Sequence, residues 1–243
     1  MLQIFENSQQ ISQAAAELFV QKAQEAVKER GRFTVALTGG SSPVQMHQLL
    51  AQSPYLEQVP WGQTHVFWGD ERWVPLTDER SNAKMAFDTF LNQVSIPQEQ
   101  IYPMWAQETE PEEFAHQYAA LLQHHFGQAA PEFDLIYLGM GDDGHTLSLF
   151  PGTPVLQEDT KWVQAYYLEA QSMYRVTLTA PIANQARTIC FLTFGENKAK
   201  ALCEVLEGER NPEQYPSQLI QPKSGDMRWL VDEKAASLLK NRS

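Results

Sequence analysis

Near its beginning, the chain has a stretch in which apolar residues recur every three or four positions. Within residues 8–30 these positions are Ile11, Ala15, Leu18, Phe19, Ala23, Ala26 and Val27. This period predicts an amphipathic helix with one buried face. We expect Ser8 to cap the start of this helix and Gly31 to end it.

Beyond residue 31 the pattern changes to short, continuous apolar runs. Four such runs, at residues 33–37, 65–68, 133–138 and 189–194, predict strands. Strands that are apolar on both faces are typical of sheets covered on two sides. Two further short strands, joined by a polar turn, are expected at 162–166 and 174–179.

Helical periodicity returns after the buried runs. One helix is expected to reach about Ala51, because Pro43 suits a first helical position and Ser42 suits a cap. Others are expected at about 82–91, 111–126, 196–207 and 232–240. Buried strands that alternate with helices predict an α/β fold with a mostly parallel sheet and helices on both faces. Since no repeat or Gly/Ser-rich linker divides the chain, we expect a single domain over residues 1–243.

Composition identifies a folded, acidic protein. The 243 residues are 43% hydrophobic and 20% charged, and include enough aromatic side chains for a core without disulfide or metal staples. The formal net charge of −12 repels phosphate backbones and anionic lipids. We therefore expect neither nucleic acid nor membrane as a partner, and any anionic ligand needs a local positive site.

The first residues and the cysteines favour a cytoplasmic protein. Residues 1–7 lack the regions of a signal peptide, and no apolar stretch approaches the roughly 18 residues of a membrane span. Cys190 lies in an apolar run and Cys203 in a helix-like stretch, which suits reduced thiols.

Polar residues gather where the predicted strands end, and in an open parallel sheet these ends form one ligand-binding edge. The first loop carries Gly39, Gly40, Ser41 and Ser42. Its amides and hydroxyls suit a phosphate, although such a sequence is also common in a simple turn. It matches neither the P-loop nor the dinucleotide fingerprint, so no nucleotide is expected.

The next two loops place carboxylates beside basic side chains. Asp70 and Arg72 follow a buried run, with Asn82 at a predicted helix start, and they form either a structural ion pair or part of a site. Asp143 precedes His145 by two residues, with a glycine between them. A carboxylate that orients an imidazole makes a general base for water. The alternative is that Asp143 caps a helix and His145 is an ordinary surface residue.

The fourth loop places Lys198 in the first turn of a predicted helix, where the helix dipole disfavours a cation unless an anion lies nearby. An exposed lysine is the alternative. The histidines at 116, 124 and 125 lack the spacing of a helical metal site, so no metal is expected. The chain has no G-x-S-x-G motif to supply an acyl-enzyme nucleophile.

Five motifs in register resemble those of 6-phosphogluconolactonases. They are LTGGSSP at 37–43, WGDER at 68–72 with RSN at 80–82, LGMGDDGHTLSLFPG at 138–152, RVTLT at 175–179 and GENKA at 195–199. The resemblance covers roughly residues 33–206. It implies a Rossmann-like fold shared with glucosamine-6-phosphate deaminases, without nucleotide or cofactor, and a sugar-phosphate site at the carboxyl ends of the strands.

The resemblance also implies an activity and roles for residues. The reaction is hydrolysis of 6-phospho-D-glucono-1,5-lactone to 6-phospho-D-gluconate in the pentose phosphate pathway, by a monomer or small homo-oligomer. His145 becomes the general base for water, and Asp143 orients it. The implied substrate contacts are Gly40, Ser41, Ser42, Arg175 and Lys198 at the phosphate, and Asp70 and Arg72 at the sugar.

Two alternatives belong to other functional classes. An aminosugar-phosphate deaminase or isomerase would carry Asn-Glu-Pro with a catalytic Glu after the Gly-His pair, whereas this chain reads SLFP at 148–151. A non-catalytic sugar-phosphate-binding module would have lost Asp143 or His145. Asp142 and Leu147 stand where many relatives are expected to have Pro and Ala, which affects the expected loop geometry. Since a lactone is an activated ester, one oriented water and one base suffice for its hydrolysis.

Overall fold

The computed structural model describes residues 1–127, 129–223 and 225–242. Its centre is a seven-stranded sheet in the order β1-β10-β9-β6-β2-β3-β5, in which all neighbouring strands are parallel. These strands are β1 (Leu2–Phe5), β2 (Phe33–Leu37), β3 (Thr64–Trp68), β5 (Ile101–Tyr102), β6 (Leu135–Gly139), β9 (Thr188–Thr193) and β10 (Asp226–Asp232). Every residue of β2 and β9 is buried, as the continuous apolar runs predicted.

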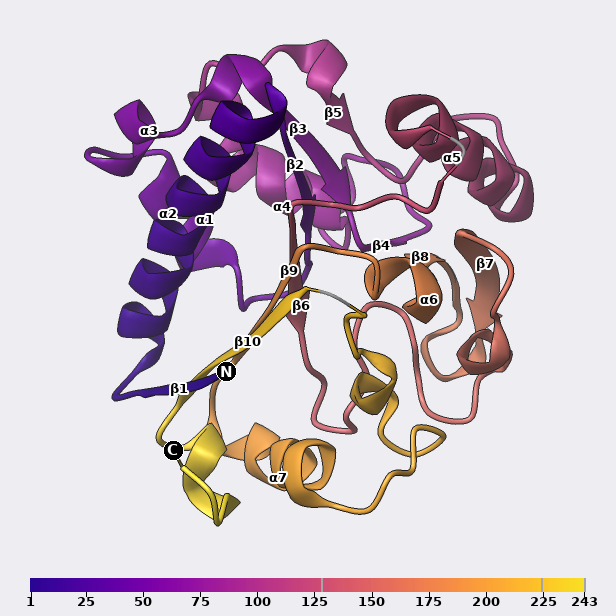
Figure 1. Ribbon diagram of the computed structural model, residues 1–243. Helices are drawn as coiled ribbons and strands as arrows, with labels where there is room; N and C mark the ends of the chain where they lie inside the picture. Colours follow the sequence, from indigo (N-terminus) through magenta and orange to yellow (C-terminus); the bar gives the residue numbers. More distant parts are fainter. Residues whose placement is uncertain (128, 224, 243) are drawn as a thin grey trace.

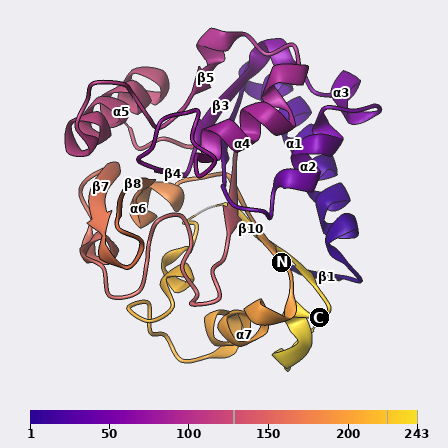
Figure 2. The ribbon, with the colours of Figure 1, turned by 180° about the vertical axis from the view of Figure 1, so that it is seen from behind.

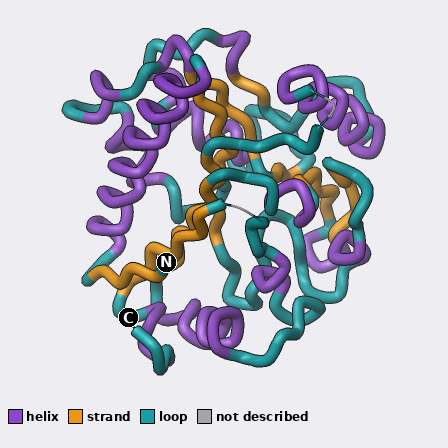
Figure 3. The backbone as a smooth tube through the Cα atoms, in the orientation of Figure 1, coloured by secondary structure: helices purple, strands orange, loops and turns teal. Residues whose placement is uncertain are grey.

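Helices lie on both sides of this sheet, so the predicted α/β fold is confirmed. Figure 1 shows α1 and α2 on one side, and α6 with a second, smaller sheet on the other. Figure 3 shows the strands running between these layers, and Figure 2 shows α4 in front of them from behind. The helices are α1 (Ser8–Arg30), α2 (Val44–Leu50), α3 (Tyr55–Gln58), α4 (Asn82–Thr89), α5 (Pro111–Phe126), α6 (Ala180–Ala183) and α7 (Ala199–Glu207).

The strand order reverses between β2 and β6. From β2 the chain moves outward through β3 to β5, and then returns to β6 on the other side of β2 before it continues to β9 and β10. At such a point the connections leave the carboxyl ends of two adjacent strands in opposite directions, which opens a crevice between them. The loops after β2 and β6 are therefore placed side by side by topology.

The smaller sheet is antiparallel, in the order β4-β8-β7, and consists of β4 (Asp70–Arg72), β7 (Val163–Leu168) and β8 (Met173–Leu178). The expected strand pair at 162–166 and 174–179 is confirmed within two residues. Residues 70–72, expected in a loop, instead form β4. Gly69 joins the two sheets: its amide donates to the Leu37 carbonyl at 2.9 Å, and its carbonyl accepts from the Leu178 amide at 2.8 Å.

Two predicted helix caps are wrong. Asn7 rather than Ser8 caps α1, because its side chain accepts a hydrogen bond from the Gln10 amide at 3.0 Å. Pro43, in helical conformation, occupies the cap position of α2 in place of Ser42, and among the described residues no side chain makes a capping hydrogen bond to this helix. Gly31, with φ of 76°, ends α1 as expected.

The helix expected at 232–240 is also wrong. Asp232 is the last residue of β10, and only a single 3₁₀ turn, Ala235–Leu238, follows. The Asp232 carboxylate accepts from the amides of Gly195 and Ala235, at 3.0 and 2.7 Å, and so ends the strand with a tight turn. In the described residues, no helix has the length and hydropathy needed to cross a bilayer.

Candidate active site

A cleft of about 480 Å³ opens at the carboxyl edge of the large sheet. A volume of this size suits a small-molecule ligand. All four predicted loops line it, together with β8. The predicted residues on its wall are Gly39, Gly40, Ser41, Ser42, Asp70, Arg72, Asn82, His145, Arg175 and Lys198.

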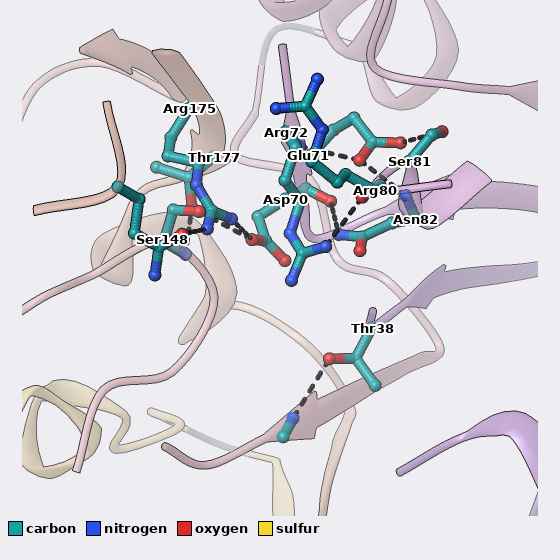
Figure 4. Close-up of polar contacts among 12 residues, drawn as sticks. Thr38, Asp70, Glu71, Arg72, Arg80, Ser81, Asn82, Ser148, Arg175 and Thr177 are labelled. Atoms are coloured by element: carbon teal, nitrogen blue, oxygen red, sulfur yellow. Dashed lines mark hydrogen bonds and ion pairs between the residues drawn. The ribbon is translucent and has the colours of Figure 1, made fainter. Parts of the chain in front are cut away.

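The loop after β2 presents unused donors to the cleft. In the described part of the chain, no hydrogen bond uses the amides of Gly40, Ser41 or Ser42. Gly40 has φ of 74°, which a residue with a side chain rarely adopts. The Thr38 hydroxyl accepts from the Gly139 amide at 3.1 Å and so ties this loop to the one after β6 (Figure 4). The loop can therefore offer several donors to one anion.

Asp70 of β4 and Arg175 of β8, two neighbouring strands of the small sheet, form the buried floor of the cleft (Figure 4). The Ser148 hydroxyl donates to Asp70 Oδ2 at 2.7 Å, and Arg175 Nη1 lies 3.8 Å from the same oxygen. Arg175 also donates to Gln171, while its Nε is buried without a partner among the described residues. Burial lowers the pKa of the Arg175 guanidinium, the Asp70 charge opposes this, and repulsion from Arg72 adds to the lowering. The two guanidiniums thus concentrate positive charge in an acidic protein.

Arg72 and Asn82 form the wall between this floor and the first loop. Arg72 Nη1 donates to the Arg80 carbonyl at 2.7 Å. The Asn82 side-chain amide donates to the Asp70 carbonyl at 2.9 Å. A Cβ at Gly39 would lie 1.9 Å from Asn82 Oδ1, so a glycine is required for the first loop to approach Asn82.

The loop after β6 turns back on itself and holds the pair Asp143 and His145. Asp143 Oδ1 lies 2.6 Å from His145 Nδ1 and accepts from the His145 amide at 3.0 Å. Partial burial alone would raise the pKa of Asp143, but these hydrogen bonds outweigh it and lower the pKa. Asp143 caps no helix here. Its ionised carboxylate keeps the proton on Nδ1, which leaves Nε2 as the basic nitrogen.

The absence of a side chain at Gly141 leaves space for the Asp143 and His145 side chains. A Cβ at Gly141 would lie 2.1 Å from His145 Nδ1 and 2.3 Å from Asp143 Oδ1. The Gly141 amide donates to the His145 carbonyl at 2.8 Å, which closes the turn. Asp143 does not line the cleft itself but lies behind the imidazole.

Phe150 packs on the imidazole and was not predicted as a site residue. Its ring stacks on His145, with centroids 3.9 Å apart and an interplanar angle of 22°. The Arg175 guanidinium lies 5.4 Å from the centroid of the same ring. Sequence reasoning also missed Gln171 and Asn197 on the cleft wall, since an isolated amide carries no recognisable pattern.

Lys198 follows β9 in a 3₁₀ turn, Glu196–Lys198, directly before α7. It is half-buried and lines the cleft. Its ammonium and the start of α7 both favour a bound anion. In residues 1–127, 129–223 and 225–242, no group of three or more His, Cys, Asp or Glu side chains is arranged to hold a metal ion.

The sequence matches the family described as "Glucosamine-6-phosphate isomerases/6-phosphogluconolactonase" over residues 6–229. The 6-phosphogluconolactonase of Synechocystis sp. is 40% identical over 237 residues, which cover 96% of each chain. The solved 6-phosphogluconolactonase from Trypanosoma brucei shares the fold with a TM-score of 0.85 and 25% identity, over 98% of both chains. A monomeric glucosamine-6-phosphate deaminase also shares the fold, with a TM-score of 0.82 and 20% identity, over 98% of this chain and 99% of that one.

Proposed function

The chain belongs to the glucosamine-6-phosphate isomerase/6-phosphogluconolactonase family, and from this premise we propose how its cleft works as a lactonase. The reaction is hydrolysis of 6-phospho-D-glucono-1,5-lactone to 6-phospho-D-gluconate in the pentose phosphate pathway, as in its curated relatives. The observation that carries the mechanism is the Asp143–His145 pair, whose imidazole lines the same cleft as the phosphate-type loop.

His145 acts as the general base. Its Nε2 takes a proton from water while the water oxygen attacks the lactone carbonyl carbon, and Asp143 stabilises the imidazolium that forms. The tetrahedral intermediate then breaks the bond between this carbon and the ring oxygen. The imidazolium returns its proton to that oxygen, and the new carboxyl group loses a proton to solvent. Because the lactone is an activated ester, this route needs no covalent nucleophile.

The phosphate is held by the loop after β2 and by cations across the cleft. The amides and hydroxyls of Gly40, Ser41 and Ser42 supply hydrogen bonds, and Lys198 and Arg175 supply charge. At a Debye length of about 8 Å, these close contacts outweigh the distant carboxylates of a protein with net charge −12. Asp70 and Arg72 line the part of the cleft that receives the sugar.

One assay tests the function directly. The purified protein is given 6-phosphogluconolactone and, in parallel, glucosamine 6-phosphate, with and without EDTA. We expect lactone hydrolysis that EDTA leaves unchanged, and no ammonia release. Faster conversion of the aminosugar phosphate would contradict the lactonase assignment. Activity lost in EDTA and restored by a divalent ion would contradict the metal-independent mechanism.

We also propose that residues 1–243 form one domain and that the protein works in the cytoplasm as a monomer or small homo-oligomer. A continuous hydrophobic core supports the first point, since Ala165 and Val176 of the small sheet belong to the same buried cluster as Leu37 and Phe191 of the large one. The free thiols of Cys190 and Cys203 suit a reducing compartment.

A further inference from the structure

Glu71 lies between Asp70 and Arg72 in β4, and the mechanism above gives it no part. Its side chain is completely buried. Because side chains alternate along a strand, it points to the side opposite Asp70 and Arg72. Figure 4 shows its carboxylate directed toward the start of α4.

Four donors converge on this carboxylate. Oε1 accepts from the amides of Arg72 and Asn82, both at 2.7 Å. Oε2 accepts from the Ala83 amide at 2.8 Å and from the Ser81 hydroxyl at 3.0 Å. All four partners donate, so the arrangement favours the ionised carboxylate, which accepts at both oxygens.

The same contacts satisfy the first turn of α4. The amides of Asn82 and Ala83 open the helix and would otherwise lack partners, while Ser81 Oγ accepts from the Lys84 amide at 3.0 Å. A negative charge is also favoured at this end of a helix. Burial raises the pKa of Glu71 to about 7, although the hydrogen bonds from Asn82, Ala83, Arg72 and Ser81 each lower it.

We propose that Glu71 is a positioning residue for ligand binding, whose ionised carboxylate holds Arg72 and Asn82 in place on the cleft wall. Both backbone amides bind the same oxygen, so one group sets the spacing between a residue of β4 and a residue of α4. Asn82 in turn packs against Gly39 of the first loop. The inference rests on the proposed function, since it takes Arg72 and Asn82 as contacts of the substrate.

Asp134 provides a matched control for a purely structural role. It too is a buried carboxylate, and it accepts from the Thr34 amide at 2.8 Å, the Thr34 hydroxyl at 2.9 Å and Arg30 Nε at 3.0 Å. It lies directly before β6, at the edge of the sheet opposite the cleft. Glu71→Gln and Asp134→Asn each turn two acceptor oxygens into one oxygen and one NH₂ group that faces donors.

The test compares these variants in unfolding, in kcat and KM for the lactone, and in calorimetric binding of 6-phosphogluconate, which needs no turnover. We expect both variants to unfold at lower temperature. Glu71→Gln should weaken 6-phosphogluconate binding and raise KM by about tenfold or more, with a smaller change in kcat, whereas Asp134→Asn should change each by less than about twofold. In an Arg72→Ala/Asn82→Ala background, Glu71→Gln should add less than about threefold, because it acts through those residues.

The proposal would be overturned if the Glu71→Gln variant bound 6-phosphogluconate as tightly as wild type. It would also be overturned if Glu71→Gln weakened binding by the same factor in the Arg72→Ala/Asn82→Ala background as in wild type. If Glu71→Gln does not fold, Glu71→Asp, which keeps the charge but shortens the side chain, enters the same comparison with the same expected order. Wild-type protein that binds 6-phosphogluconate but leaves the lactone intact would refute the proposed function and leave this inference standing.

Discussion

Replacing the proposed base, His145→Asn, tests the mechanism at its centre. The imidazole is held on one edge by Asp143, at 2.6 Å, and on one face by the Phe150 ring. Asparagine retains a polar, planar group but accepts no proton from water. A positioned general base contributes about 10²- to 10⁴-fold, so kcat should fall by that factor. KM should change little, because other residues hold the phosphate and the sugar.

The size of the Asp143→Asn effect follows from the contact it weakens. The amide keeps the shape and can still accept from the His145 backbone, but the charge that stabilises the imidazolium is lost. A hydrogen bond to a charged group contributes about 1.5–3 kcal/mol, which corresponds to about 10- to 150-fold in kcat. The Asp143 side chain is 42% exposed, so solvent screening favours the lower part of this range. The double variant should be no slower than His145→Asn alone, since Asp143 acts through the imidazole.

The assay is the initial rate of lactone hydrolysis across pH, with spontaneous opening subtracted at each pH and folding checked by circular dichroism. A folded His145→Asn protein that keeps more than about half of wild-type kcat would refute the assignment of the base. Asp70 would then be the next carboxylate on the cleft wall to test.

Three further predictions concern the phosphate, the turn around the base and the core. Lys198→Ala should lower kcat/KM for the phosphorylated lactone by about 10- to 150-fold and leave kcat/KM for unphosphorylated gluconolactone unchanged. Arg175→Ala should have the same effect on both substrates. It should also lower stability, because it leaves the buried Asp70 carboxylate with fewer partners. Equal losses with both lactones would contradict a phosphate role. Gly141→Ala places a methyl group 2.1 Å from the imidazole Nδ1, so kcat should fall about tenfold or more. The control is Gly62→Ala, whose methyl group would meet no described atom within 4 Å and should leave kcat unchanged. Wild-type kcat in both variants would show that Gly141 is not needed to make room for the imidazole. Burial lowers the pKa of His47 to about 3, so this group is neutral when folded but protonates near pH 6.5 when unfolded, and stability is lost as pH falls below that value by up to about 1.4 kcal/mol per unit. The free energy of unfolding, measured with denaturant from pH 8 to pH 5, should fall less steeply with decreasing pH in His47→Gln than in wild type. An equal dependence on pH in both proteins would show that His47 does not contribute to the loss of stability in acid.

Sequence patterns were most informative where burial repeats along the chain. Residues 33–37 and 189–194 are strands covered on both faces, and a continuous apolar run expresses that burial directly. Residues 8–30 and 111–126 are helices at the predicted bounds, since one buried face imposes a period of three or four. The helix prediction for residues 232–240 was wrong for a physical reason. The alanines and leucines there have helical spacing, but the Asp232 carboxylate accepts from the Ala235 amide and from the Gly195 amide of another segment, and one 3₁₀ turn follows.

The local chemistry of the cleft could be predicted from the sequence: a glycine-serine loop, a carboxylate two residues before an imidazole, and a lysine before a helix. Within each of these groups the residues are close together along the chain, so their spacing in the sequence is enough to identify the group. The tertiary structure alone decided how the loops are joined. The Ser148 hydroxyl donates to Asp70, 78 positions away in the sequence, and Glu71 of β4 accepts from the Asn82 amide at the start of α4. Such contacts depend on strand order and on the reversal between β2 and β6, and no local period in the sequence encodes which distant donor will reach a buried carboxylate.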